Sequence, residues 1–252
     1  MNAQIVSLIA PAKLTVSLKV TGVRADGFHL IDAEMVTLDL ADQLVVDTSR
    51  TGLEIIGEFA DDLAASNDLN NNLVSRALQL ASRKAHVTVT KNIPSGGGLG
   101  GGSADAAAIL RWAGFTDLAS AAKLGADIAF CIVGGRARVS GIGEVVNPLK
   151  KIAREITLVV PPFRVSTPAV YRAFDQLTDF GKTPIKHAGV NDLEPAAIKV
   201  EPRLAIWKEK IAKACGVVPT LAGSGSTWWL DGKFENLAEQ LADATVICTQ
   251  TN

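Results

Sequence analysis

The stretch NIPSGGGLGGGSADAAAIL, residues 92–110, holds six glycines within seven positions and then runs into alanines. Glycine loses more conformational freedom on folding than any other residue, so such a run is costly unless the backbone has to be bare. A strand-like segment, 86–93, precedes it, and 103–114 reads as a helix with Ser103 as its N-cap. A glycine loop between a strand and a helix start predicts a phosphate site, because bare N–H groups and the positive helix end attract an anion.

Three widespread phosphate loops compete for this stretch, and each fails on its surroundings. A Walker A loop needs lysine after the last glycine, where this chain has Ser103. The dinucleotide pattern GxGxxG fits Gly96, Gly98 and Gly101, but it should follow the first strand of a βαβ unit, and here several strands come before it. A protein-kinase loop should be accompanied by VAIK-like and HRD segments, which are missing.

The composition indicates a globular protein without a general affinity for polyanions. The 252 residues are 48% hydrophobic and 20% charged, with a net charge of −1, so nucleic acid and membranes are not expected partners. Any anion must therefore be held by a local site. Three scattered cysteines indicate reduced thiols, and no apolar stretch approaches the ~20 residues of a membrane span. These features predict a cytoplasmic protein.

The hydrophobic pattern divides the chain into two α+β halves. Segments 13–20 and 34–40 alternate around a turn at 24–27, which predicts a hairpin, and further strands and a helix at 71–85 lead to the glycine loop. After a polar, basic segment at 142–154, the pattern predicts strands near 155–161, 217–223, 227–233 and 244–250, with helices near 166–177, 191–199, 203–215 and 234–242. We expect two domains, residues 1–150 and 151–252.

PSGGGLGGGSADAA (94–107) resembles the phosphate loop of the GHMP kinases, the family of galacto-, homoserine, mevalonate and phosphomevalonate kinases. PAKLT (11–15) and LAGSGST (221–227) stand where that family has its first and third motifs. LGADIAFCIVGG (124–135) and NDLEPAA (191–197) extend the likeness, which is strongest to members acting on a cytidine-diphosphate-linked methylerythritol. The resemblance implies a two-domain α+β kinase, with a ribosomal-protein-S5-domain-2-like N-terminal domain, a ferredoxin-like C-terminal domain and the active site between them.

The resemblance also implies roles for individual residues. Lys13 and Asp127 match the catalytic lysine and aspartate, with Asp127 orienting the accepting hydroxyl and Lys13 offsetting negative charge. ATP with Mg²⁺ is the implied co-substrate, and Ser103 is a candidate for approaching the metal. The implied ATP-binding residues are Asn72, Lys91, Pro94, Ser95, Gly96, Gly97, Gly98, Leu99, Gly100, Gly101, Gly102, Ser103 and Ala104.

The acceptor site is implied by a second group of residues. Phe28 and His29 suit a pyrimidine, which an aromatic ring can stack on and an imidazole can hydrogen-bond. The other implied substrate residues are Thr15, Gly223, Ser224 and Gly225. Thr15 and Ala129 depart from the family, which usually has asparagine and proline there.

Three interpretations of the function stay open on the sequence alone. The leading one is phosphorylation of the 2-hydroxyl of the cytidine-diphosphate-linked methylerythritol, a step of isoprenoid precursor biosynthesis. The second is a GHMP kinase with another small acceptor, and the third is a catalytically silent protein of the same fold that senses a nucleotide or metabolite. Retention of both Lys13 and Asp127 argues against the third.

Overall fold

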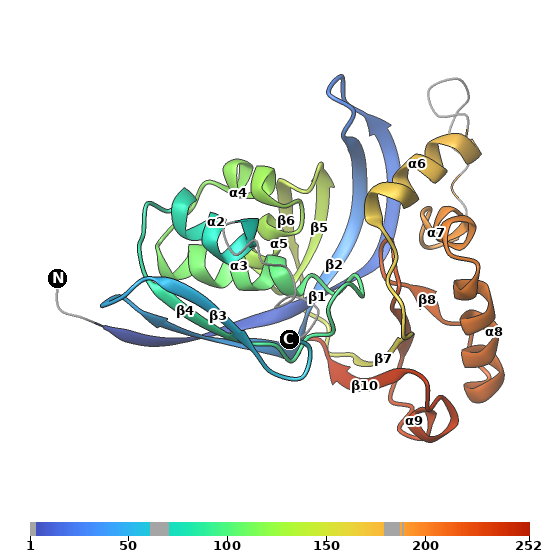
Figure 1. The fold of residues 1–252 in the computed structure, drawn as a ribbon. Helices are drawn as coiled ribbons and strands as arrows, with labels where there is room; N and C mark the ends of the chain where they lie inside the picture. Colours follow the sequence, from blue (N-terminus) through green and yellow to red (C-terminus); the bar gives the residue numbers. More distant parts are fainter. Residues whose placement is uncertain (1–3, 61–70, 179–186, 188) are drawn as a thin grey trace.

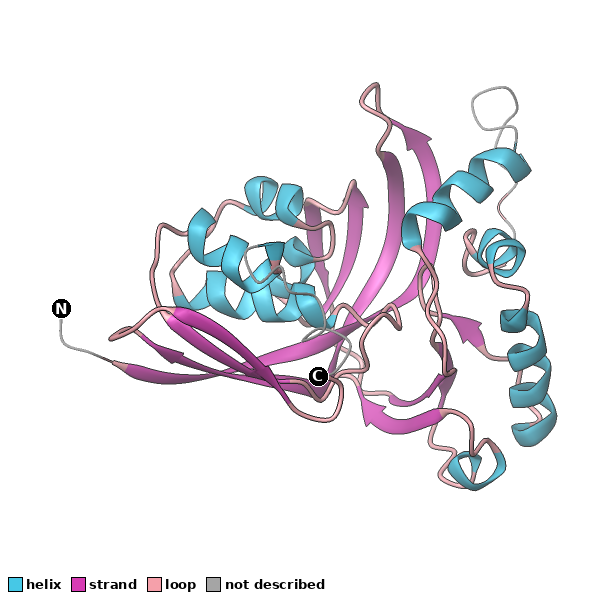
Figure 2. Cartoon of the chain, viewed as in Figure 1, coloured by secondary structure: helices cyan, strands magenta, loops and turns pink. Residues whose placement is uncertain are grey.

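The structure, a computed structural model, describes residues 4–60, 71–178, 187 and 189–252. Two sheets carry the fold, one of six strands and one of four, with helices packed on both (Figures 1 and 2). The α+β class expected from the sequence is confirmed. No helix in the described part of the chain has the length and apolar character needed to cross a membrane.

The larger sheet is built on the predicted hairpin, which is longer than the sequence pattern indicates. Strands β1 (Ile5–Val23) and β2 (His29–Asp47) pair antiparallel along their whole length. Since β1 occupies one edge of β2, the strands β4 and β5 share the opposite edge, at its two ends. β3 and β6 extend these two branches; the bounds are β3 (Gly52–Ile56), β4 (His86–Thr90), β5 (Arg136–Gly141) and β6 (Val145–Leu149).

A group of helices packs beside this hairpin and holds the glycine loop. The alanine-rich α3 contacts α2, α5 and β1, and its small buried side chains let these elements approach closely. The prediction that Ser103 caps α3 is wrong: the N-cap is Gly100, with φ of 71°. The bounds are α2 (Leu73–Leu80), α3 (Gly101–Trp112), α4 (Leu118–Leu124) and α5 (Ile128–Val133).

The smaller sheet has the strand order β10-β7-β9-β8 and is antiparallel throughout. Taken with its helices, this is the βαββαβ pattern of a ferredoxin-like domain. Its strands are β7 (Glu155–Val160), β8 (Thr220–Leu221), β9 (Trp228–Asp231) and β10 (Thr245–Gln250). Its helices are α6 (Thr167–Thr178), α7 (Glu194–Val200), α8 (Arg203–Cys215) and α9 (Leu237–Gln240).

Hydrogen bonds tie the long hairpin to the second half of the chain. The backbone of Leu18 donates to the carbonyl of Val190 and accepts from the N–H of Asp192, each at 3.0 Å. The chain passes from one sheet to the other between β6 and β7, inside the segment where the sequence predicts a domain boundary. The domain limits themselves, 1–150 and 151–252, remain a prediction.

Candidate active site

The glycine loop lies directly against the first motif. The backbone N–H of Lys13 donates to the carbonyl of Leu99 at 3.0 Å. At Gly100, a Cβ atom would stand 2.7 Å from Cγ of Lys13, and the positive φ also disfavours any side chain there. Glycine is therefore required at position 100 for the loop to pack against the Lys13 side chain.

The backbone of the loop leaves its donors free. Within the described residues, none of the backbone N–H groups at positions 96–103 donates a hydrogen bond to another protein atom. These positions lead into the first turn of the 12-residue helix α3, where backbone N–H groups have no partner within the helix. Unpaired donors at a helix start favour binding of an anion.

Lys13 and Asp127 meet across the site. The Nζ atom of Lys13 lies 3.0 Å from a carboxylate oxygen of Asp127, and the two side chains are 6% and 32% exposed. Asp127 stands at the start of α5 but its side chain caps nothing, so the carboxylate is available to Lys13 and to a ligand. The hydroxyl of Thr15 accepts a further bond from Lys13 at 3.2 Å. Thr15, which stands where the family usually has asparagine, therefore helps to hold the Lys13 side chain in place.

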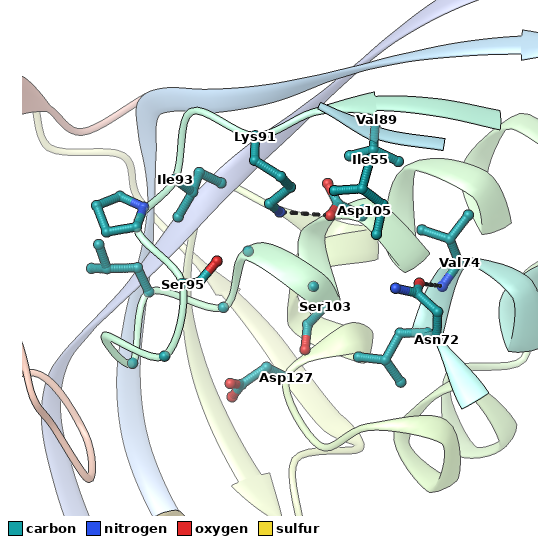
Figure 3. A pocket seen from close by; sticks show the side chains of 18 of the residues that line it. Ile55, Asn72, Val74, Val89, Lys91, Ile93, Ser95, Ser103, Asp105 and Asp127 are labelled. Carbon is teal, nitrogen blue, oxygen red and sulfur yellow. Dashed lines mark hydrogen bonds and ion pairs between the residues drawn. The ribbon is translucent and has the colours of Figure 1, made fainter. Parts of the chain in front are cut away.

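One cavity, the loop cavity, follows the glycine loop and has a volume of about 520 Å³ (Figure 3). Most of the predicted ATP-binding residues line it, together with Asp105 and Asp127. Gly97 and Ala104 do not: Gly97 packs against Thr227, and Ala104 is buried in α3. The predicted residues on its wall are Asn72, Lys91, Pro94, Ser95, Gly96, Gly98, Leu99, Gly100, Gly101, Gly102 and Ser103.

Lys91 is not a solvated surface lysine, because two buried carboxylates hold its ammonium group. It bonds Asp42 and, at 2.7 Å, Asp105, and all three side chains are at most 5% exposed. Asp42 also accepts from the backbone N–H groups of Asn92 and Ile93, at 2.6 and 2.8 Å. The cluster joins β2, the entrance of the glycine loop and α3, and so fixes the loop on the sheet.

Asp105 should give the protein a measurable pH dependence. Burial raises the pKa of Asp105 to about 7, although the charge of Lys91 acts in the opposite direction. The unfolded chain releases this proton near pH 4, so the stabilisation is complete below that pH and is lost as the pH rises to about 7. Asp105→Asn does not titrate. Between pH 5 and 8 the free energy of unfolding of this variant should therefore rise relative to that of the wild type, by about 3 kcal/mol.

Urea unfolding at several pH values measures the free energy of unfolding of each protein. Subtracting one from the other at each pH cancels the titrations that both proteins share. Asp42→Asn is the matched comparison, because Asp42 has three donors to satisfy and its replacement should destabilise the fold at every pH. Parallel stability curves for wild type and Asp105→Asn would contradict the assignment.

A second cavity, the hairpin cavity, lies between the β1–β2 hairpin and α6 and also has a volume of about 520 Å³. Of the predicted acceptor residues, Thr15, Phe28, His29, Gly223 and Ser224 line it, together with the predicted catalytic Lys13, but Gly225 does not. Asp127 and Gly98 line both cavities. The two spaces therefore meet at the Lys13–Asp127 pair.

The third motif packs on the glycine loop rather than standing apart from it. The backbone N–H of Thr227 donates to the carbonyl of Gly97 at 3.2 Å. The side-chain amide of the buried Asn191 donates to the carbonyls of Leu221 and Gly223, at 2.9 and 2.7 Å. Asn191, from the NDLEPAA segment, thus holds the motif in place.

Several residues of the site were not predicted from the sequence. Helix α6 contributes Tyr171, whose ring centroid is 4.7 Å from that of His29, and Asp175, whose carboxylate is 2.6 Å from Nε2 of His29. Thr167 of α6 bonds the hydroxyl of Ser224 at 2.7 Å. The spacing of these three residues along one helix face was the available signal.

Comparisons with known proteins identify the family of this chain. Residues 72–135 match the GHMP kinases N terminal domain. A 4-diphosphocytidyl-2-C-methyl-D-erythritol kinase from Paracoccus denitrificans (strain Pd 1222) is 39% identical and covers 92% of this chain and 88% of its own length. One of the same name from Desulfitobacterium hafniense (strain Y51) is 33% identical, with 94% and 90% covered.

A crystal structure of a 4-(cytidine 5'-diphospho)-2C-methyl-D-erythritol kinase superimposes with a TM-score of 0.75, at 29% identity, covering 98% of this chain and 99% of its own. The chain therefore belongs to the GHMP kinase family, and the predictions of this fold and of an ATP-dependent small-molecule kinase are confirmed. Its likeness to kinases named for the cytidyl-methylerythritol substrate is also confirmed.

Proposed function

We propose that the protein transfers the γ-phosphoryl group of ATP to the 2-hydroxyl of 4-diphosphocytidyl-2-C-methyl-D-erythritol, giving the 2-phosphate and ADP in isoprenoid precursor biosynthesis. The observation that carries the proposal is the meeting of the two cavities at Lys13 and Asp127. ATP occupies the loop cavity and the acceptor occupies the hairpin cavity, so the phosphoryl group passes from one to the other beside the pair. The names of the relatives support the choice of acceptor.

Asp127 orients the accepting hydroxyl and collects its proton. A carboxylate is a weak base for an alcohol, but the transition state of phosphoryl transfer is loose, so the proton leaves late and strong basicity is not needed. Lys13, at 3.0 Å, fixes the carboxylate and offsets the negative charge that develops on the transferred group. Backbone structure positions both residues. The N–H of Lys13 donates to the carbonyl of Leu99, and Asp127 is the N-cap residue of α5.

The free N–H groups at positions 96–103 bind the phosphates of ATP. Mg²⁺ bound with the nucleotide would neutralise charge on its phosphates. Ser103 is the residue proposed to approach this ion, since it lines the loop cavity together with Asp127 (Figure 3).

The cytosine of the acceptor lies at the hairpin end of its cavity. Phe28 is 58% exposed at the mouth of that cavity, and the ring of Tyr171 stands beside His29 on its inner wall. Two aromatic faces and an imidazole provide stacking and hydrogen bonding for a pyrimidine. The contact with Asp175 holds the imidazole in one orientation.

His29→Ala should therefore weaken acceptor binding selectively. We expect the KM for the cytidyl acceptor to rise about tenfold, the loss of one good hydrogen bond and its stacking partner, while the KM for ATP stays constant. Steady-state kinetics with each substrate varied in turn measures both values. His86→Ala, on β4 and outside both cavities, is the control. An equal rise in both KM values would contradict the placement of the base.

The proposal is tested by ADP release from the purified protein with Mg²⁺-ATP. The acceptors are 4-diphosphocytidyl-2-C-methyl-D-erythritol, methylerythritol phosphate, mevalonate and homoserine. Turnover with the cytidyl substrate alone supports the proposal. Turnover with another acceptor would support a kinase activity but contradict the proposed substrate. ATP binding without any turnover would contradict the proposed catalytic activity.

A further inference from the structure

One face of helix α6 forms a wall of the hairpin cavity. The residues that contribute to this wall are Thr167, Pro168, Tyr171, Arg172 and Asp175. Thr167, Tyr171 and Asp175 follow one another at intervals of four positions, and Pro168 and Arg172 form a second row beside them, so the five make one broad stripe along the helix. The contacts of this stripe define its two ends, as Thr167 bonds Ser224 of the third motif and Asp175 bonds His29 of the hairpin. Arg172 lies between these two fixed points.

The stripe runs between the two chemical ends of the proposed acceptor. Ser224 belongs to the glycine turn beside the phosphoryl-transfer end, and His29 belongs to the end assigned to cytosine. Arg172 stands midway along this part of the helix and lines the hairpin cavity. The part of the acceptor that joins the base to the reacting alcohol must therefore lie next to this part of the cavity wall.

Among the described residues, the charges that line the hairpin cavity are paired with one exception. Lys13 is paired with Asp127 at 3.0 Å, and His29 lies 2.6 Å from Asp175. Arg172, the remaining charged side chain of the wall, has no hydrogen bond or ion pair to any residue that the structure describes. Of the side chains that the structure describes on this wall, Arg172 is thus the cation left uncommitted, and its guanidinium can bind phosphate oxygens through two parallel N–H groups.

We infer that Arg172 binds the diphosphate of the acceptor and so selects a diphosphate-linked alcohol over the free alcohol. The inference rests on the proposed function, because it takes cytidine and the reacting hydroxyl as the two ends of the ligand. In that arrangement the diphosphate lies between His29 and Asp127, beside the middle of α6. Arg172 acts on binding and not on the chemical step, since Lys13 and Asp127 are the pair at the reacting atoms.

Calorimetric titration with CDP and with cytidine tests the inference, with Mg²⁺ and a non-hydrolysable ATP analogue present so that the loop cavity is filled. For the wild type we expect CDP to bind more tightly than cytidine. Arg172→Gln should lose about tenfold in affinity for CDP and leave the affinity for cytidine unchanged. Arg172→Lys should fall between the two, because an ammonium keeps the charge and loses the paired N–H groups.

Two further readouts separate this role from a structural one. In turnover assays, Arg172→Gln should raise the KM for the cytidyl acceptor about tenfold with kcat within about twofold of the wild type. Added salt should weaken CDP binding more for the wild type than for the variant, because screening acts on the removed charge. Arg83→Gln, an exposed arginine after α2 that lines neither cavity, changes the net charge equally and should behave as the wild type.

The outcomes distinguish the inference from the proposed function. If the wild type binds neither cytidine nor CDP and does not turn over the cytidyl acceptor, the proposed function fails and the inference falls with it. If the wild type does all three and Arg172→Gln loses CDP and cytidine equally, or loses neither, the inference alone is overturned.

Discussion

Replacing Asp127 with asparagine should lower kcat by about 10³-fold while ATP still binds within a few-fold of its normal affinity. Asparagine keeps the size of the side chain and can still orient a hydroxyl, but it cannot accept the proton. Acid–base groups of this kind contribute about 10²–10⁴-fold to a rate. The substitution also leaves Lys13 without its partner at 3.0 Å, which disturbs the position of the ammonium group. ADP release measures kcat, and nucleotide titration measures the binding.

A matched control removes a carboxylate elsewhere. Asp117 caps helix α4 through a bond from the N–H of Ser120, and asparagine caps a helix equally well. Asp117→Asn should therefore have the kcat and stability of the wild type. A kcat for Asp127→Asn within tenfold of the wild type would show that proton removal does not depend on this residue.

Adding one methyl group at Gly98 should destabilise the fold by about 3 kcal/mol or more. A Cβ atom there would stand 2.8 Å from the carbonyl oxygens of both Ala222 and Gly225, and neither is the end of a flexible side chain. The φ of 80° adds strain for any residue with a side chain. The glycine loop and the third motif would have to separate, so Gly98→Ala should also lose nucleotide binding.

The comparison variant is Gly102→Ala, four positions further along the chain. Its Cβ atom would meet only Leu73, at 3.5 Å, which is ordinary contact, and the residue lies in helix α3, where alanine is favoured over glycine. Its free energy of unfolding should equal that of the wild type or exceed it slightly. Thermal or urea unfolding of the two variants gives the difference, and equal stabilities would refute the close approach at Gly98.

Much of the architecture could be predicted because it depends on local pattern. The alternation at 13–20 and 34–40 is the signature of the β1–β2 hairpin, and the strand and helix order after residue 155 reproduces the ferredoxin-like half. The start of α3 could not be predicted by the same means. Side-chain capping rules favour Ser103, but the helix begins after Gly100, which packs against Lys13, 87 positions earlier in the sequence.

The candidate site likewise has residues that local motifs predict and residues that only tertiary packing brings together. Lys13, Asp127 and the glycine loop could be predicted as site residues because each stands in a long motif. Lys91 was expected near the nucleotide, but nothing in the sequence indicates that Asp42 and Asp105 would enclose it, since their meeting depends on how β2 and α3 pack. The residues of α6 were missed because a helical stripe looks the same whether it faces a core or a cavity.

Two cavities of equal size that share Asp127 and Gly98 on their walls have a consequence for inhibitor design. A single molecule that joins an adenosine polyphosphate to the cytidyl alcohol can occupy both spaces through one short bridge. Binding of its first half raises the effective concentration of the second, so its affinity should exceed that of either half by orders of magnitude. Lengthening the bridge beyond the span between the two sites should reduce this gain. The bridge length that gives the highest affinity would therefore report the distance over which the phosphoryl group travels.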